Sequence, residues 1–571
     1  MNQTNARWWK EVCVYQVYPR SYKDSNGDGV GVISSLDYIK SLGVDVIWMS
    51  PVYPTPNEDN GYDISDYRGI NPEFGTMEDF DLLLSEAHKR DLKIVMDLVV
   101  NHTSDQHPWF IEARKSKDNP YRDYYIWRDG KEGKEPNNWQ SFFGGTVWEK
   151  NDATDDYYLH LFAKGQPDLN WENPRVRDEV KDIVHFWAGK GVDGFRLDVI
   201  NCISKVEGLP DAPIKNPTDK YHWAGEHFFN GPKFMEYMSQ IRKEAFDRYD
   251  VFTVGETPSV TPDHGATFTH IDTGVVHMLF QFEFVALDTD PNGSHRFDSI
   301  KPQLRDIKGV TTKWQTELGR DGWNSLYLEN HDQPRSVSRY GCVETEELRV
   351  ISAKMLAAWY LFQKGTPYIY QGQELGMTNC HFKDIGECRD IETLNYYREM
   401  MDKGETAERA MKGIRVKSRD NARTPMQWNT EANAGFCREG VRPWIDVNKN
   451  FREINVEAAV GDENSVFHFY KKILQLRRQH KVVVYGEYEL LAGEHAQAYV
   501  YTRTAGDEQI VVLANFEREN CSVDLSGEKL LGGEGELLIA NYNDVDEKRQ
   551  MTQTFQLRAY EVQVYIVSKK Q

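Results

Sequence analysis

The sequence has 571 residues, which is more than one ordinary domain but within reach of one large barrel with additions. Apolar residues make up 40% and charged residues 27%, so a sizeable core can form and long disorder is excluded. The net charge of −21 argues against nucleic acid and anionic membranes as partners, because both attract clustered Lys and Arg. The sequence contains no run of about 18 apolar residues, so no membrane span is predicted. Residues 1–10 do not resemble a secretory signal.

The seven cysteines are scattered from Cys13 to Cys521 without a C-x-x-C pair. This pattern predicts reduced thiols in a cytoplasmic protein, rather than a disulfide framework or a zinc site. Aromatic residues reach 12%, which suits a protein whose side chains stack on the faces of sugar rings. We expect a monomer or a weak homo-oligomer.

Short apolar runs alternate with amphipathic segments along most of the chain. The predicted buried strands are residues 11–18, 44–49, 93–100, 194–199, 251–256, 323–328 and 367–371. One predicted helix follows the N-cap Asn173 and ends at Gly189 and Gly191. Its buried face is formed by Val176, Val180, Ile183, Val184 and Trp187. About eight such units would close a (β/α)₈ TIM barrel, an α/β fold with its chemistry at the C-terminal ends of the strands.

Two regions interrupt the strand–helix alternation. Residues 104–170 are rich in Asp, Asn, Trp and Gly and contain short strand-like pieces, which predicts an inserted domain after the third strand. Residues 491–571 contain short alternating runs, which predict a C-terminal antiparallel β domain. The barrel is therefore expected in two parts, residues 1–103 and 171–490.

Three acidic residues stand at the ends of predicted barrel strands: Asp198, Glu256 and Asp332. A single acid in such a place often caps the following helix. Here each strand is apolar until it meets the acid, and Arg196 and His331 lie beside two of the acids. Ionisable clusters at the ends of buried strands indicate a catalytic site.

Several motifs stand in a characteristic order: residues 97–102 (DLVVNH), the acids at 198, 256 and 332, residues 166–170 (QPDLN) and residues 422–428 (ARTPMQW). With these motifs the chain resembles glycoside hydrolase family 13, the α-amylase superfamily, and within it the oligo-1,6-glucosidase and α-glucosidase branch. The resemblance covers nearly the whole chain. It implies an enzyme that acts on small oligosaccharides.

The resemblance implies a role for each acid. Asp198 would be the nucleophile, Glu256 the general acid and base, and Asp332 the transition-state stabiliser. This retaining mechanism needs the first two carboxyl groups about 5–5.5 Å apart. It also needs their pKa values pushed apart, with Glu256 protonated and Asp198 held ionised by Arg196.

The resemblance also implies a pocket for the cleaved glucose. His102, His331 and Gln166 would bind sugar hydroxyls, while Asp97 would act indirectly by placing Arg196 and His102. Tyr62 would stack on the sugar ring.

An exo-acting enzyme needs a pocket that is blocked beyond one glucose. Asp63 would grip the non-reducing end, and Arg423 would form an ion pair with it, with Arg419 as a rival partner. Phe143 and Phe162 would wall the pocket, unless they belong to the core of the inserted domain.

Val199, directly after the nucleophile, indicates the preferred linkage. In the family, Val here accompanies α-1,6 specificity, because a branched side chain narrows the acceptor site. Glu329 and Thr257 are weaker candidates for shaping that site. The expected activity is that of a retaining exo-acting α-glucosidase that releases glucose from isomaltose and short α-1,6-linked oligosaccharides.

Other activities remain open. Sucrose isomerases carry an arginine-rich loop where residues 286–290 lack arginine. Trehalose-6-phosphate hydrolases share residues 198–201 (DVIN) but need a basic pocket for the phosphate, and they are the runner-up. Lys205 and the nearby basic residues are too few to decide between the two activities, and the acidity of the chain argues against the phosphorylated substrate. Cleavage of α-1,4 bonds or sucrose is also open. A non-catalytic partner of a membrane transporter would need an anchoring helix and would lack one of the acids.

Residues 24–29 (DSNGDG) resemble the start of a calcium loop. The resemblance implies that Asp24, Asn26, Asp28 and the carbonyl of Val30 bind a structural Ca²⁺ or Mg²⁺, with Val32 where the family has a further Asp. Ser35 stands where an EF-hand needs Glu, so an EF-hand is excluded. No catalytic cofactor is expected.

Overall fold

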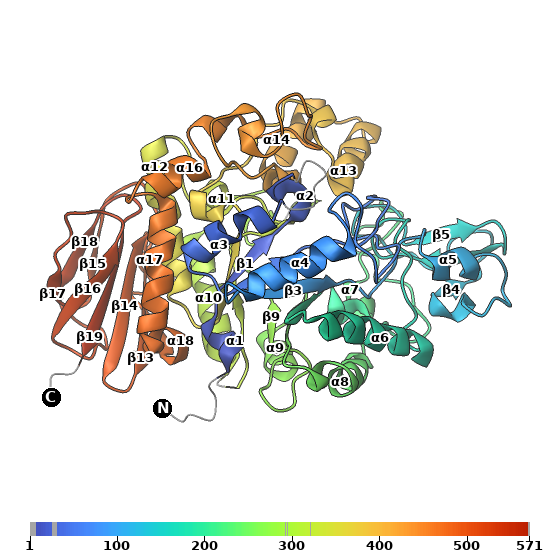
Figure 1. Ribbon diagram of the computed structural model, residues 1–571, viewed down its shortest axis with the longest axis horizontal. Helices are drawn as coiled ribbons and strands as arrows, with labels where there is room; N and C mark the ends of the chain where they lie inside the picture. The colour runs from blue at the N-terminus through green and yellow to red at the C-terminus, as the bar shows by residue number, and fades with distance from the viewer. Residues whose placement is uncertain (1–6, 25–30, 292, 294, 320, 569–571) are drawn as a thin grey trace.

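The computed structural model describes residues 7–24, 31–291, 293, 295–319 and 321–568. Its centre is an eight-stranded parallel sheet in the order β10-β11-β1-β2-β3-β7-β8-β9 (Figure 1). The two end strands meet through a bridge between Leu279 and Asn324, which closes the barrel. The strands are β1 (Val14–Val17), β2 (Val46–Met49), β3 (Lys93–Leu98), β7 (Gly194–Leu197), β8 (Phe252–Glu256), β9 (Met278–Phe280), β10 (Ser325–Leu326) and β11 (Thr366–Tyr370).

The predicted (β/α)₈ barrel is therefore confirmed, and each of the predicted strands overlaps a strand of the structure. The barrel strand that the sequence did not predict is β9, which has only 3 residues. A run that short lacks a periodicity that sequence reasoning could detect.

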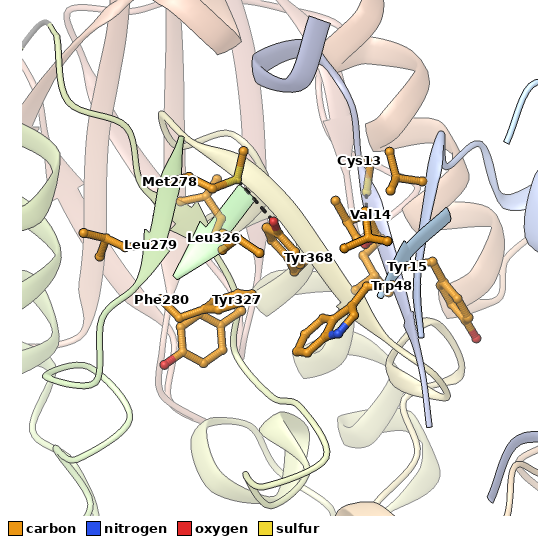
Figure 2. Packing of buried hydrophobic residues seen from close by; sticks show 14 of the residues in the cluster. Cys13, Val14, Tyr15, Trp48, Met278, Leu279, Phe280, Leu326, Tyr327 and Tyr368 are labelled. Atoms are coloured by element: carbon orange, nitrogen blue, oxygen red, sulfur yellow. Dashed lines mark hydrogen bonds between the residues drawn. The ribbon is translucent and has the colours of Figure 1, made fainter. Parts of the chain in front are cut away.

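Aromatic side chains fill the barrel interior. Figure 2 shows Trp48, Phe280, Tyr327 and Tyr368 between the strands. The ring centroids of Phe280 and Tyr368 are 4.6 Å apart in an edge-on contact. Trp48 also donates a hydrogen bond from Nε1 to Asp97 Oδ2 at 2.9 Å. A side chain of the barrel core, Trp48, therefore holds the carboxylate of Asp97 in place.

Helices surround the barrel (Figure 1). Those that follow the barrel strands are α3 (Leu36–Leu42), α4 (Met77–His88), α6 (Pro174–Lys190), α8 (Phe234–Glu244), α9 (Pro262–Phe268), α10 (Leu304–Glu317), α12 (Glu346–Leu361) and α17 (Val466–Gln479). The predicted helix is α6, capped by the side chain of Asn173. It ends at Gly191, whose φ of 104° suits glycine, whereas Gly189 lies inside the helix. Shorter helices are α1 (Trp8–Glu11), α2 (Pro19–Tyr22), α7 (Gly225–Phe228), α11 (Ser336–Tyr340), α16 (Val456–Gly461) and α18 (Lys481–Tyr485).

The segment after β3 projects from one end of the molecule (Figure 1). It contains α5 (Pro108–Ala113) and a small antiparallel sheet in the order β4-β6-β5. These strands are β4 (Trp127–Arg128), β5 (Trp148–Asn151) and β6 (Asp156–Leu159). A second addition follows β11 and contains α13 (Ile391–Asp402), α14 (Ala407–Lys417) and α15 (Asp420–Arg423).

The C-terminal part forms antiparallel sheets at the opposite end (Figure 1). The larger has the order β12-β13-β14-β19-β16-β17, and β15 pairs with β18. The strands are β12 (Glu487–Leu491), β13 (Ala498–Ala505), β14 (Glu508–Asn515), β15 (Cys521–Asp524), β16 (Glu534–Ala540), β17 (Lys548–Gln550), β18 (Thr554–Leu557) and β19 (Val562–Ser568). Buried Arg503 of β13 donates to the carbonyl of Phe362 at 3.2 Å, which joins this sheet to the end of α12.

Within the described ranges, no helix combines the length and the hydropathy needed to cross a membrane. All seven cysteines have free thiols.

Candidate active site

The C-terminal ends of β7 and β8 bring two acids to one guanidinium group. Nη1 of Arg196 lies 2.6 Å from Asp198 Oδ1, and its Nη2 lies 2.6 Å from Glu256 Oε2. All three side chains are buried. The predicted nucleophile and the predicted acid are therefore neighbours, and their predicted carboxyl separation of about 5–5.5 Å stays a prediction.

The pKa values of these two acids are both raised. Burial raises the pKa of Asp198 to about 7 and that of Glu256 to about 7, while Arg196 opposes both shifts. Arg196 contacts both carboxylates, so the two acids titrate as a coupled pair. The expected separation of their pKa values stays a prediction.

The pKa of Asp332 is shifted in the opposite direction, downward. Burial alone would raise its pKa, but His331, Arg419 and Arg423 keep it well below the usual range. Nε2 of His331 lies 3.0 Å away, and Nη2 of Arg423 lies 2.6 Å away. Asp332 is therefore ionised at neutral pH and offers a charged acceptor to sugar hydroxyls.

Asp97 lies beneath the pair on β3. Its side chain is inaccessible to solvent and forms an ion pair with Arg196. The hydroxyl group of Tyr62 donates to Asp97 Oδ2 at 3.3 Å. Asp97 therefore orients Arg196, and through it both acids.

The predicted sugar-binding side chains form one connected layer. The ring of Tyr62 stacks on His331 with centroids 5.0 Å apart and planes 10° apart. His102 Nε2 lies 3.0 Å from the carbonyl oxygen of Tyr62, and Gln166 Nε2 donates to the same oxygen at 3.1 Å. Burial lowers the pKa of both histidines, so their rings are neutral at neutral pH.

The predicted ion pair between Asp63 and Arg423 is wrong. The carboxylate of Asp63 accepts the backbone N–H groups of Glu58 and Asp59 at 2.8 and 3.0 Å, so it holds a turn. Arg423 pairs with Asp332 instead. A linear motif cannot tell which of two neighbouring acids points into a pocket.

The rival residue, Arg419, contacts two acids of the site. Arg419 Nη2 lies 3.0 Å from Oδ1 of Asp59, and its Nη1 lies 3.3 Å from Oδ1 of Asp332. Asp390 holds the same guanidinium group at 2.5 Å and also caps α13. Sequence reasoning missed Asp59 and Asp390. Asp59 could have been found from its place three residues before Tyr62.

Phe143 and Phe162 link the inserted segment to this layer. The guanidinium group of Arg419 lies 4.9 Å above the ring of Phe143. The ring of Phe162 lies 5.2 Å from that of His102 and 4.5 Å from that of Phe142. Phe162 therefore serves both the site and the core of the inserted segment.

The residues proposed for the acceptor site differ in their placement. The side chain of Val199 is 8% exposed, and it packs in a cluster with side chains of the inserted segment. Glu329 is buried and accepts from Arg335 and from the N–H of Ser336, at 3.0 and 2.6 Å. Thr257 is buried and donates to the carbonyl of Phe280. The last two hold local structure, and their assignment to the acceptor site stays a prediction.

Lys205 forms a buried cross-link. Its Nζ lies 2.6 Å from Asp168 Oδ2 and 3.1 Å from Asn101 Oδ1. The contact joins the end of β3 to the inserted segment. Because only 5% of its side chain is exposed, this ammonium group is not available to a phosphate.

Three predicted ligands of the metal loop, Asn26, Asp28 and Val30, lie outside the described residues, so the metal site stays a prediction. Asp24 is described, and its N–H donates to the carbonyl of Phe436 at 3.0 Å. Across the part of the chain that the structure describes, no group of three His, Cys, Asp or Glu side chains could hold a metal ion.

Known proteins resemble this chain over its whole length. The family described as "Alpha amylase, catalytic domain" matches residues 16–486. An oligo-1,6-glucosidase of Parageobacillus thermoglucosidasius is 55% identical, with 98% of each chain covered. An oligo-1,6-glucosidase of Bacillus cereus is 52% identical, with 98% of this chain and 99% of the other covered. The solved trehalose-6-phosphate hydrolase of Bacillus licheniformis is 44% identical, with a TM-score of 0.91 and coverage of 99% and 100%.

A parallel barrel with buried acids at its strand ends and a family match of this length define a glycoside hydrolase. The chain belongs to the α-amylase family, glycoside hydrolase family 13. Its identity to two oligo-1,6-glucosidases above 50% puts it in the oligo-1,6-glucosidase branch.

Proposed function

We propose that this enzyme is a retaining, exo-acting α-glucosidase of the oligo-1,6-glucosidase type. It releases glucose from the non-reducing end of isomaltose and short α-1,6-linked oligosaccharides. The observation that carries the proposal is the pair of contacts from Arg419 to Asp59 and Asp332, at 3.0 and 3.3 Å. We expect this buried ion pair to block the site at one end, so that it accepts a single terminal sugar.

The proposed mechanism uses the two acids in turn. Asp198 attacks the anomeric carbon while Glu256 gives a proton to the leaving oxygen, which forms a covalent glycosyl-enzyme intermediate. Glu256 then takes a proton from water, which attacks the same carbon and restores its configuration. This division needs Asp198 ionised and Glu256 protonated at the start of the reaction. Ionised Asp332 would bind ring hydroxyls most strongly in the transition state.

The proposed preference for α-1,6 bonds rests on Val199 and on the names of the relatives. Val199 follows the nucleophile directly, and a branched side chain there narrows the space for the acceptor sugar. The relatives from Parageobacillus thermoglucosidasius and Bacillus cereus, at 55% and 52% identity, are both named oligo-1,6-glucosidase.

Trehalose-6-phosphate hydrolysis is less well supported, although a solved enzyme of that name has the same fold. Its substrate carries a phosphate, which needs free cationic groups. Lys205 is engaged by Asp168 and Asn101 instead. Sucrose isomerisation is also disfavoured, because residues 286–290 contain no arginine.

The test is a comparison of initial rates on isomaltose, maltose, sucrose and trehalose-6-phosphate at neutral pH. We expect isomaltose to be cleaved fastest. Good hydrolysis of maltose with isomaltose untouched would overturn the linkage assignment, and dominant cleavage of trehalose-6-phosphate would replace the proposed substrate while keeping the mechanism.

Further properties are proposed from the sequence. Free cysteine thiols and a net charge of −21 support a cytoplasmic enzyme without a nucleic-acid partner. The loop that begins at Asp24 is proposed to bind one structural Ca²⁺ or Mg²⁺, and a rise in thermal midpoint on adding Ca²⁺ would support this. A monomer or weak homo-oligomer is expected, and no catalytic cofactor is proposed.

A further inference from the structure

Val199 has an unusual backbone. Its φ and ψ are 34° and 40°, in the left-handed region, which a β-branched residue rarely adopts because Cβ crowds the carbonyl oxygen. Strain of this kind persists only where the surroundings enforce it, and it concentrates at functional sites. Its position between the predicted nucleophile and the turn η4 (Ile200–Cys202) calls for a functional reason.

This backbone conformation directs a donor at the predicted general acid. The N–H of Val199 donates to Oε2 of Glu256 at 3.1 Å. Arg196 Nη2 lies 2.6 Å from the same oxygen. In the described part of the chain, no side-chain or backbone hydrogen bond reaches the other oxygen, Oε1. The hydrogen bond and the close guanidinium group at Oε2 leave little space for a proton on that atom.

The surroundings hold the turn in place. Asn201 Nδ2 donates to the carbonyl of Pro258 at 2.7 Å, which ties the turn to the segment just after Glu256. The side chain of Val199 is packed in the cluster that contains Trp139 and Phe228. The packing of the inserted segment therefore enforces the conformation of Val199.

We propose that Val199 is a positioning residue that acts through its backbone N–H. Together with Arg196, this N–H occupies Oε2 of Glu256, so the catalytic proton is carried on Oε1. The inference rests on the proposed glucosidase function and adds to it the atom that delivers the proton. This backbone role is distinct from the effect of the Val199 side chain on linkage.

The proton balance of the step is as follows. The proton on Oε1 moves to the glycosidic oxygen as the bond from that oxygen to the anomeric carbon breaks and Asp198 bonds to the carbon. Glu256 is left as a carboxylate whose charge is stabilised by the N–H of Val199 and the guanidinium group of Arg196 at Oε2. In the second half of the reaction, Oε1 takes a proton from water. The water oxygen bonds to the anomeric carbon as the bond between that carbon and Asp198 breaks.

The test replaces one backbone N–H by oxygen without changing the side chain. An α-hydroxy acid with the valine side chain, incorporated at position 199, converts the amide into an ester. We expect the basic limb of the pH profile of kcat/KM on isomaltose to move to higher pH by about one unit, because the ionised form of Glu256 loses a donor. The matched control is the corresponding ester at Ile200, whose N–H does not contact Glu256 in the described structure.

A basic limb that stays in place in the 199 ester, or moves equally in the 200 ester, would overturn the inference. Neutron diffraction of the deuterated wild-type enzyme gives an independent readout. Deuterium on Oε1 of Glu256 supports the inference, and deuterium on Oε2 contradicts it. If the wild-type enzyme cleaves no α-glucoside, the proposed function fails instead, while the deuterium position still reports on the contact.

Discussion

Arg419 lies 3.0 Å from Asp59, although 360 residues separate them along the chain. Asp59 lies in the loop between β2 and α4, and Arg419 lies in the addition after β11. Because β2 and β11 flank β1 in the barrel, these two loops meet at its C-terminal edge. The contact therefore joins two loops at this edge of the barrel, beside Asp332.

Substitution of Asp59 by Asn should damage substrate binding. It removes the charge that holds Arg419 across the pocket, so we expect kcat/KM on isomaltose to fall roughly 10²-fold, mainly through KM. The matched control is Asp63→Asn, four residues on, whose carboxylate accepts the backbone N–H groups of Glu58 and Asp59. Steady-state kinetics on both variants distinguish the two acids. Equal losses of kcat/KM would contradict the assignment of Asp59 to the pocket.

Asp63 should instead affect the pH dependence of stability. Burial raises its pKa from 3.8 to about 7, so between these pH values the folded state binds more protons than the unfolded state. The free energy of unfolding therefore falls as pH rises, by roughly 4 kcal/mol for this group alone. Urea unfolding from pH 4.5 to 7.5 should show a smaller fall for Asp63→Asn than for wild type. Parallel curves for the two proteins would show that Asp63 is ionised in the folded state.

Loss of the general acid should depend on the leaving group. We expect Glu256→Gln to lower kcat/KM on isomaltose by about 10²–10⁴-fold. An aryl α-glucoside whose leaving group needs no proton should lose much less in the first step. Asp198→Asn should lose activity on both substrates, because the nucleophile is needed whatever the leaving group. Circular dichroism checks that both variants fold, and equal losses on both substrates for Glu256→Gln would contradict its role as acid.

Lys205 should stabilise the inserted segment. In Lys205→Met the apolar stem remains but Asp168, inaccessible to solvent, loses its cation. Leaving a buried charge unpaired costs about 3–5 kcal/mol, so the thermal midpoint should fall. The double variant Lys205→Met/Asp168→Asn should recover part of the loss, since no charge is left unpaired. If calorimetry shows no fall for the single variant, the cross-link contributes nothing to stability.

Much of the fold and the acids of the site could be predicted from the sequence. Apolar runs such as residues 251–256 end in an acid, and this pattern indicates a buried strand whose C-terminal end meets polar surroundings. The exceptions were short or ambiguous. β9 has too few residues for a period, and Gly189 is tolerated inside α6 because helix packing outweighs its poor propensity.

The sequence by itself determined the barrel, the three acids and the family, because strand periodicity and local motifs are properties of contiguous residues. Only the tertiary structure decided that Asp59 rather than Asp63 meets Arg419, that Arg196 contacts Asp198 and Glu256 alike, and that Val199 adopts a left-handed backbone. The physical reason is that each of these depends on the packing of loops from different strands. Electrostatic pairing and burial are set by distances in space, which linear spacing does not encode.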